Sequence, residues 1–251
     1  MRIATWNVNS IRMRIDHIVN FLKSDNIDVL LLQELKCTND QFPYEILESA
    51  GYNCVVLGQK TYNGVAILSK YLTEEIRYGN EIFNDQQARY VECLIRGKRI
   101  ASVYVPNGQE VGATAYDYKI NFFEQLTSYL EKEIKNDDFI IGGDFNVCRN
   151  DMDVYNPNLW KDKICCSVKE RECFEKLLSI GFFDRHRELY NNEKIYTWWD
   201  YRFQGFAKNH GLRIDYILTT RNIDAQSMYI DLGTRSKEKP SDHAAVVMNI
   251  Q

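Results

Sequence analysis

Polar side chains that could perform chemistry gather where the predicted strands end. One carboxylate follows the apolar run that closes at Gln33, and another follows the strand that ends in the paired glycines 142 and 143. Strand ends and their loops are where rigid scaffolds usually carry function. A lone acid there is usually a turn or cap residue, but several in both halves of the chain favour a shared site. The set comprises Asn7, Glu34, Asn107, Asp144, Asn146, Asp215, Asp242 and His243.

These residue types match a metal-dependent phosphate hydrolase. Four acids, asparagines and one histidine form an oxygen-rich set without a thiolate, which suits Mg²⁺ or Mn²⁺ and does not suit structural zinc. Such a metal clamps phosphate oxygens and neutralises charge as the phosphorus is attacked. The residues alone therefore predict phosphoester hydrolysis. The paired glycines before Asp144 also need a reason, and the close approach of a ligand to the backbone is one.

A basic and aromatic segment runs from Trp198 to Arg213. It places Arg202, Lys208 and Arg213 among five aromatic residues, with Asp200 as the one acid. Such a mixture can hold phosphates and stack on bases or sugars. An aromatic-rich strand pair packed into a core would have the same composition, so composition alone leaves the two interpretations even.

Composition describes an ordinary soluble chain. The 251 residues are 45% hydrophobic and 26% charged, which excludes disorder and coiled coil. The 31 basic and 35 acidic residues give a net charge of −4, so the total charge gives a nucleic-acid partner no support. The longest aliphatic run, residues 27–32, is far shorter than a membrane span, and no signal peptide is recognisable at the N-terminus.

Seven cysteines show neither a CxxC pair nor metal-finger spacing, which favours a reducing, cytoplasmic location. The adjacent Cys165 and Cys166 invite a redox or metal interpretation, but free cysteine usually behaves as a small buried hydrophobe. We therefore expect both to be core residues.

Helix and strand patterns alternate along the chain without a linker, which predicts a single domain over residues 1–251. Strands this short and numerous cannot all be parallel, because parallel pairs need long crossovers. We expect an α/β fold, a four-layer α/β sandwich in which two packed mixed β-sheets are flanked by helices. The expected helices include residues 11–22, 115–136 and 168–180, and the expected strands include residues 28–33, 138–143, 195–203 and 213–219.

A weak internal repeat supports one shared site. Trp6-Asn7-Val8 and Phe145-Asn146-Val147 both place an aromatic residue, Asn and Val at the end of a predicted strand. Each lies near the start of its half. This placement raises the prospect that the two halves are related and meet at one site.

Seven ordered blocks carry a more specific signal: TWNVNSIR, LLLQELK, GVAILSK, YVPNG, IGGDFNV, GLRIDYIL and KPSDHAAVV. In order and spacing the chain resembles the exonuclease III family of DNA-repair phosphodiesterases over residues 1–250, and residues 197–215 are similar to the bacterial branch. The resemblance implies a Mg²⁺-dependent enzyme, with Mn²⁺ able to substitute. It would cut duplex DNA 5′ to abasic sites and act at 3′ ends as an exonuclease, phosphodiesterase or phosphatase.

The resemblance also implies roles for single residues. Glu34 would be the principal metal ligand, with Asn7 beside it and Asp242 as a second ligand. Asp144 would take the proton from the attacking water, which Asn146 would orient. His243 would hydrogen-bond the scissile phosphate, held by Asp215. Substrate contacts would come from Tyr104, Asn107, Lys36, Arg89, Trp198, Arg202 and Leu212.

Four positions depart from larger eukaryotic relatives. Asn9 replaces an aspartate, Glu110 follows Gln109 where those relatives insert an arginine into DNA, Leu212 replaces a pocket tryptophan, and Arg202 replaces a methionine wedge.

The expected partner is double-stranded DNA with abasic sites or 3′ ends. The protein is expected to be a monomer and to have no membrane partner. Two rivals remain: the same metal chemistry on a non-nucleic substrate such as an inositol phosphate, or a binding module that has lost catalysis. The basic and aromatic segment disfavours the first, and the intact acids and His243 disfavour the second.

Overall fold

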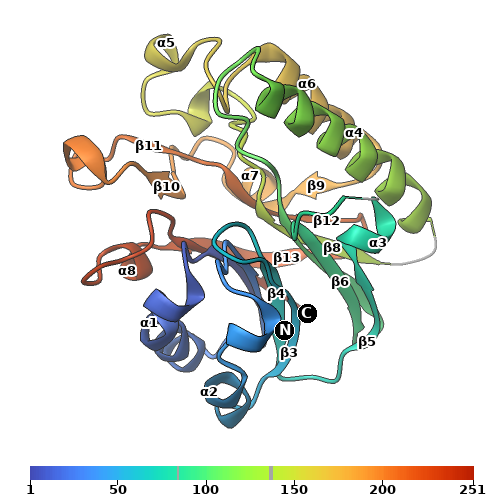
Figure 1. Ribbon diagram of the computed structural model, residues 1–251. Coiled ribbons are helices and arrows are strands. Elements are labelled where there is room, and N and C mark those ends of the chain that lie inside the picture. The colour runs from blue at the N-terminus through green and yellow to red at the C-terminus, as the bar shows by residue number, and fades with distance from the viewer. Residues whose placement is uncertain (84, 136–137) are drawn as a thin grey trace.

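Two β-sheets pack face to face, with helices on both outer sides, in the computed structural model shown in Figure 1. The structure describes residues 1–83, 85–135 and 138–251. The predicted four-layer α/β sandwich with mixed sheets is confirmed. Residue 136, at the end of one predicted helix, lies outside the described residues.

The first sheet has six strands in the order β13-β14-β1-β2-β4-β3. Only β1 and β2 among these neighbours run parallel, and the other pairs are antiparallel. The strands are β1 (Arg2–Asn7), β2 (Val29–Gln33), β3 (Asn53–Leu57), β4 (Val65–Ser69), β13 (Ala225–Asp231) and β14 (Ala245–Ile250).

The second sheet repeats this plan in the order β5-β6-β7-β8-β12-β9, with β7 and β8 as its parallel pair. Its strands are β5 (Glu74–Tyr78), β6 (Tyr90–Ile95), β7 (Lys98–Tyr104), β8 (Phe139–Asp144), β9 (Phe183–Asp184) and β12 (Asp215–Thr219). A separate short pair joins β10 (Trp198–Trp199) to β11 (Gly211–Leu212).

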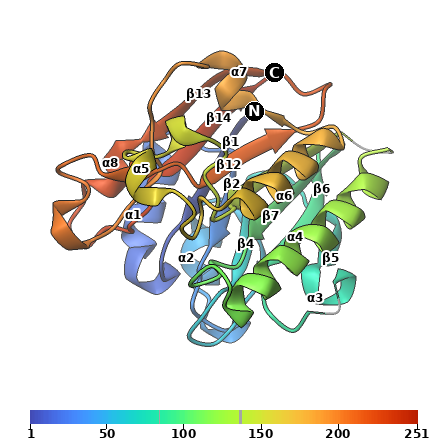
Figure 2. The same ribbon diagram turned by 90° about the horizontal axis from the view of Figure 1, so that it is seen from above.

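Helices cover the outer faces of the sheets, with α1 and α2 on the first and α4 and α6 on the second (Figures 1 and 2). No helix of the described ranges is both long and apolar enough to cross a membrane. The helices are α1 (Ile11–Ser24), α2 (Tyr44–Ser49), α3 (Gly79–Ile82), α4 (Thr114–Glu133), α5 (Pro157–Trp160), α6 (Val168–Ser179), α7 (Arg185–Leu189) and α8 (Leu232–Arg235).

Alternation along the strands builds three apolar layers. In β2, Val29 and Leu31 point into the layer between the sheets, whereas Leu30 and Leu32 point toward α1. This follows from the two-residue period of a strand, which sends successive side chains to opposite faces. Burying each such side chain contributes about 1.5 to 3 kcal/mol, so strand register and sheet packing are fixed together.

The parallel pairs bring the predicted polar residues to one end of the sandwich. Asn7 pairs with Gln33 at the end of β1 and β2, and Tyr104 pairs with Asp144 at the end of β7 and β8. Asp215 pairs with Asp144 from the other side. Both sheets therefore present their polar strand ends to the same region.

The paired glycines of β8 serve the packing of the chain rather than ligand approach. A Cβ at Gly142 would lie 2.7 Å from the Leu31 side chain of the opposite sheet. A Cβ at Gly143 would lie 1.9 Å from the backbone oxygen of Val103. The expectation of a ligand at these glycines is corrected, because protein atoms already fill the space.

The predicted strand over residues 195–203 is too long, since only β10 forms. Phe203 has φ of +58° and Gln204 has φ of +59°, which a strand cannot accommodate. The Arg202 guanidinium binds the Asp200 carboxylate at 2.7 Å, closing a turn. Trp199 is buried whereas Phe203 is 82% exposed, so this segment is partly core and partly surface.

His186 in α7 is buried without a hydrogen bond to either ring nitrogen among the described residues. Burial, together with the nearby Arg213 guanidinium, lowers its pKa to about 4. An unfolded histidine has a pKa near 6.5. The folded state therefore favours the neutral ring, whereas the unfolded chain binds a proton more readily. The free energy of unfolding consequently decreases as pH falls from about 6.5 toward 4.

We predict that His186→Phe reduces the acid sensitivity of folding. The melting temperature of the native protein should fall between pH 7 and pH 5, and that of His186→Phe should fall less, by the equivalent of roughly 1 to 2 kcal/mol. Thermal unfolding at both pH values measures this, with exposed His210→Gln as the control. The same pH dependence in native protein and His186→Phe would contradict it.

Candidate active site

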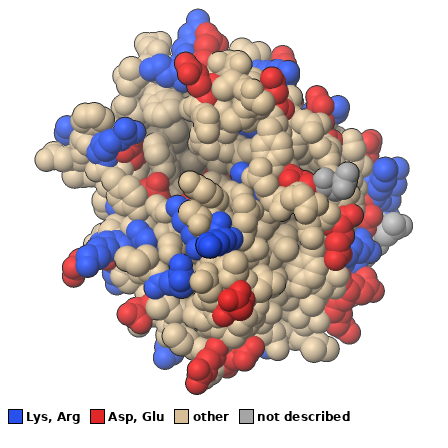
Figure 3. Space-filling view, viewed as in Figure 1, with Lys and Arg blue, Asp and Glu red and all other residues tan. Residues whose placement is uncertain are grey.

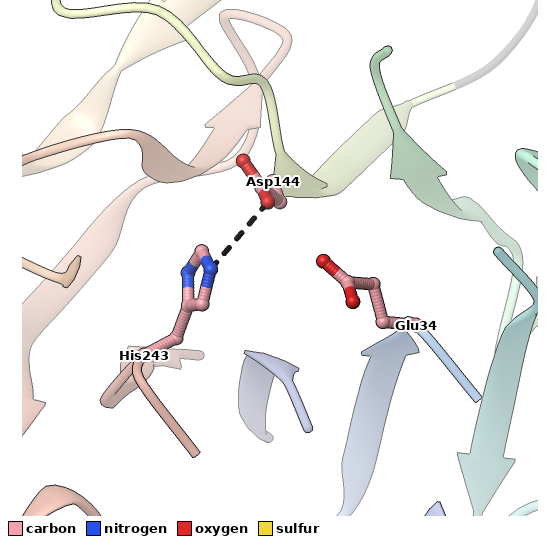
Figure 4. Close-up of side chains that lie close together, drawn as sticks. All are labelled: Glu34, Asp144 and His243. Carbon is pink, nitrogen blue, oxygen red and sulfur yellow. Dashed lines mark ion pairs between the residues drawn. The ribbon is translucent and has the colours of Figure 1, made fainter. Parts of the chain in front are cut away.

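Glu34, Asp144 and His243 meet at the polar end of the sandwich. Each offers one ligand atom, and these atoms lie within 4.8 Å of one another. Figure 4 shows the carboxylate of Glu34 and the ring of His243 pointing toward the Asp144 side of the site. They line a pocket of about 290 Å³. The three residues come from chain positions far apart and form a possible metal site.

Glu34 follows β2 in a left-handed backbone conformation, with φ of +52°. Its Oε1 accepts hydrogen bonds from Asn7 Nδ2 and from the Tyr104 hydroxyl, each at 2.9 Å. Its Oε2 lies 2.8 Å from Lys36 Nζ. Burial raises the pKa of this carboxyl, but Lys36 and Asn7 outweigh burial and lower it below the ordinary value. Glu34 is therefore an anion that could bind a cation.

Asp144 is almost fully buried at the end of β8. Its Oδ2 accepts from Asn7 Nδ2 at 3.0 Å, and its Oδ1 accepts from the Asn146 backbone N–H at 2.9 Å. Burial raises the pKa of Asp144 to about 7, against the opposing charge of His243. A carboxylate with such a pKa is suited to accept a proton near neutral pH.

His243 is held between two carboxylates. Its Nδ1 lies 2.9 Å from Asp215 Oδ2, and its Nε2 lies 3.7 Å from Asp144 Oδ2. Burial disfavours a charged ring, but Asp215 and Asp144 outweigh burial and raise the pKa of His243 to about 10. The ring is therefore an imidazolium at neutral pH, with Nε2 able to donate a hydrogen bond.

Asn146 lies on the polar floor of the site, and Asn107 bonds to it from the exposed edge. Asn107 Nδ2 donates to Asn146 Oδ1 at 3.0 Å, and Asn146 Nδ2 donates to the Val105 carbonyl at 3.0 Å. Asn146 has φ of +51°, a conformation that asparagine tolerates better than most residues. The predicted pair of asparagines is thus brought together beside Asp144.

Asp242 lies on the pocket wall but outside the three-residue group. Its Oδ1 accepts from Asn9 Nδ2 at 3.0 Å, and its Oδ2 accepts from the Trp198 indole N–H at 3.0 Å. Lys36 Nζ donates to Asn9 Oδ1 at 2.5 Å. Both oxygens of Asp242 already hold protein donors, so its observed contacts position Asn9 and Trp198.

The apolar wall of the pocket contains Trp198 and Leu212, which pair across β10 and β11. Trp160, Ile164 and Cys165 also line it, and sequence reasoning did not find them. Trp160 ends the one-turn helix α5, and Ile164 and Cys165 lie in the turns that follow it, so no strand or helix periodicity marked them in the sequence. Cys165 was expected only as a core residue, and it is buried and unpaired.

The predicted basic contacts divide into exposed and buried groups. The Arg202 side chain is 77% exposed. Arg89 is buried, donates to the Tyr104 carbonyl at 3.3 Å and lies over the Tyr104 ring. Arg213, which composition had suggested as a phosphate contact, is also buried and binds Asp184 at 2.5 Å. That suggestion is corrected, because ion pairs inside the protein hold Arg213.

Positive charge is unevenly spread over the surface. Figure 3 shows Lys and Arg side chains bordering the hollow in the left half of the view, whereas Asp and Glu predominate along the right and lower edges. A local basic surface attracts an anion even when the net charge is −4.

Comparison with known proteins agrees with this geometry. Residues 4–243 match the endonuclease/exonuclease/phosphatase family. The chain belongs to this family. Exodeoxyribonuclease III of Haemophilus influenzae is 34% identical, with 98% of each chain covered. The predicted family resemblance and enzyme class are therefore confirmed.

Two solved structures are similar over the whole chain. A 3′ phosphatase from Neisseria, bound to a product DNA hairpin, is 39% identical with a TM-score of 0.97, covering 100% of this chain and 99% of the other. An AP endonuclease from Archaeoglobus fulgidus is 34% identical with a TM-score of 0.96 and the same coverage. The similar structures thus include one enzyme named as a 3′ phosphatase and one named as an AP endonuclease.

We predict that Mg²⁺ or Mn²⁺ raises the melting temperature of the protein, because a ligand that binds only the folded state stabilises it. Glu34→Gln should abolish most of this rise, since it removes the anionic carboxylate. Thermal unfolding with and without metal measures the effect. Glu175→Gln, at a half-exposed carboxylate paired with Arg149, is the control. An equal metal-dependent rise in Glu34→Gln would rule out Glu34 as a principal ligand.

Proposed function

We propose that the protein is a Mg²⁺-dependent DNA-repair phosphodiesterase that incises duplex DNA 5′ to abasic sites and trims 3′ ends. The observation that carries this proposal is the single pocket in which Glu34, Asp144 and His243 meet beside an apolar wall. Polar residues on one side suit a phosphate, and an aromatic wall on the other suits a sugar without its base. Duplex DNA is the partner and a monomer is the active unit in this proposal.

Asp144 is the base in the proposed reaction. Its raised pKa and its place beside the pocket suit removal of a proton from an attacking water. Hydrogen bonds from Asn7 and the Asn146 backbone fix the orientation of its carboxylate. Asn146 supplies a side chain to the same floor and would orient the water or a phosphate oxygen.

His243 and Tyr104 would bind the phosphate and stabilise its charge. The imidazolium, charged because Asp215 and Asp144 flank it, would donate from Nε2 to a phosphate oxygen. The Tyr104 hydroxyl donates to Glu34, and Asn107 lies exposed at the pocket edge. Both would stabilise the charge that develops on the phosphate or on the departing oxygen.

Glu34 would hold the divalent cation, with Asn7 beside it. The donor set is oxygen-rich, which fits Mg²⁺, and Mn²⁺ shares this preference. When bound, such a cation neutralises phosphate charge during attack. Lys36, in contact with Glu34, keeps that carboxylate in its anionic form.

Substrate selection would depend on Trp198 and Leu212. A nucleotide inside a duplex must leave the stack to be processed, and this costs least where pairing is already lost. An abasic sugar could enter against the indole of Trp198, whose N–H is held by Asp242. Arg202, Lys36 and Arg89 would act on the DNA strand, Arg202 by direct contact and Arg89 through Tyr104.

One gel assay tests the proposal. Four labelled duplexes carry an abasic site, a blunt end, a recessed 3′ end or a 3′ phosphate, and each is incubated with Mg²⁺ or with chelator. Metal-dependent cleavage of the abasic strand and loss of 3′ nucleotides or phosphate are expected. Inactivity on all four, with hydrolysis of an inositol phosphate instead, would overturn it.

Asp144→Asn should lower the rate by about 10² to 10⁴-fold or more, because the general base is lost. DNA affinity should stay the same or rise, because a negative charge facing phosphate is removed. Single-turnover cleavage and a binding titration measure the two quantities. Asp151→Asn, at a side chain that is 69% exposed, should retain full activity. A fully active Asp144→Asn enzyme would exclude this residue as the base.

Trp198→Ala should lower abasic-site incision at least 10-fold more than 3′-end trimming, because it removes the apolar wall of the sugar pocket. Trp198→Phe keeps a ring while losing the hydrogen bond to Asp242, and it should keep most of the preference. Rates on the abasic and recessed duplexes give the ratio. If Trp198→Ala reduces both rates by one factor, the residue has only a packing role.

A further inference from the structure

A buried ion pair lies behind the active site, between helices α4 and α6. Lys119 of α4 and Glu170 of α6 are both 0% exposed and bind each other. Elsewhere these helices pack through apolar residues such as Phe123 and Phe174. A buried ion pair is often no more stabilising than apolar side chains of similar volume. The packing of the two helices alone therefore does not explain these charges.

All three N–H donors of the Lys119 ammonium have partners. One donates to Glu170, and the other two donate to backbone carbonyls of the active site. Nζ donates to the Asn146 carbonyl at 2.7 Å and to the Asn107 carbonyl at 3.1 Å. An ammonium has three N–H donors, so Glu170 and these two carbonyls satisfy all of them. The loops that follow β7 and β8 are thus held at one point.

Glu170 holds a third active-site segment. Its Oε1 accepts from the Cys165 backbone N–H at 3.0 Å, and its Oε2 accepts from the Ser167 backbone N–H at 3.0 Å and the Ser167 hydroxyl at 2.6 Å. Cys165 lines the pocket. The pair therefore connects the segments at residues 107, 146 and 165.

Two of these held residues have left-handed backbone conformations. Asn146 has φ of +51° and Cys165 has φ of +67°. Such conformations persist only where the surroundings over-determine them. Gly108 adds a further constraint, because a Cβ there would lie 3.1 Å from the Lys119 side chain. The loop after Asn107 thus packs directly over the lysine.

The hydrogen-bond chain leads from Lys119 to the proposed base. Lys119 holds the Asn146 carbonyl, and the backbone N–H of the same Asn146 holds Asp144 Oδ1 at 2.9 Å. A shift in this backbone would rotate the Asp144 carboxylate. Misplacement of a catalytic group by about 1 Å can cost 10²-fold in rate.

We propose that Lys119 and Glu170 are positioning residues that fix the backbone of Asn107, Asn146 and Cys165. They thereby orient the Asp144 carboxylate to take the proton from the attacking water. This inference rests on the proposed function, since it concerns the same pocket and the same base. Neither residue touches the pocket itself, so each acts only through the backbone groups that it binds.

The double variant Lys119→Met/Glu170→Leu tests the proposal because it removes both charges without leaving one unpaired. Steady-state kinetics on the 3′-phosphate and recessed 3′-end duplexes should give a kcat lowered about 10 to 10²-fold, with KM changed less than about threefold. The rate should fall over the whole pH range. Hydrogen exchange at the backbone amides of residues 146 and 165 should accelerate.

Two controls separate positioning from stability. Arg99→Met/Glu92→Leu removes another buried pair of the second sheet and should leave kcat unchanged. Arg99 lies about 17 Å along β7 from Tyr104, and Glu92 pairs with Ala101, about 10 Å along β7 from Tyr104. Tyr116→Phe deletes a hydroxyl that bonds Ser167 at the α4–α6 contact without touching the pair, and should also leave kcat unchanged.

The outcomes are distinct. Inactive native protein on every duplex would defeat the proposed function, whereas active native protein with unchanged kcat in the double variant would overturn the positioning role alone. A kcat loss matched by Arg99→Met/Glu92→Leu, or a raised KM with unchanged kcat, would also overturn it. If the double variant does not fold, Glu170→Gln keeps the shape of the side chain, and its kcat and KM decide by the same criterion.

Discussion

One amide group joins the two halves of the site. Nδ2 of Asn7, at the end of the first sheet, donates to Glu34 of the same sheet at 2.9 Å and to Asp144 of the second sheet at 3.0 Å. Two buried carboxylates repel each other unless donors or cations lie between them. The amide reduces this repulsion without adding charge, so both acids can face one pocket. This contact joins the polar end of the first sheet to that of the second.

A second polar contact between the sheets lies one layer deeper. Gln33 donates to the hydroxyls of Thr5 and Ser102, each at 3.0 Å, and Ser102 donates to the Leu32 carbonyl at 3.0 Å. Apolar packing tolerates small shifts, whereas buried polar groups lose free energy when their partners move. These bonds therefore fix the alignment of the two sheets directly below the catalytic residues. The buried pair Lys119 and Glu170 fixes the loops above the strands.

Local sequence patterns were sufficient to predict the layers of the sandwich and to single out the residues that meet in the pocket, Glu34, Asp144 and His243. The alternation of Leu30 and Leu31 and the strand-end positions of Glu34 and Asp144 are local patterns, and these patterns decide the sheet faces and edges. The motif resemblance supplied the remaining roles. The contacts of Asp242 with Trp198 and Asn9, and the burial of Arg213, depend on segments far apart in the chain. No local pattern reports such contacts.

Gly142 sets a limit on how the enzyme can vary. With only a hydrogen atom on its α-carbon, it lets the Leu31 side chain rest on bare backbone, where a methyl group would lie 2.7 Å away. A larger residue here would require the end of the Leu31 side chain to move, in the layer between the sheets and only two residues before Asp144. The missing side chain of this glycine thus makes room for a leucine of the opposite sheet directly beneath the pocket.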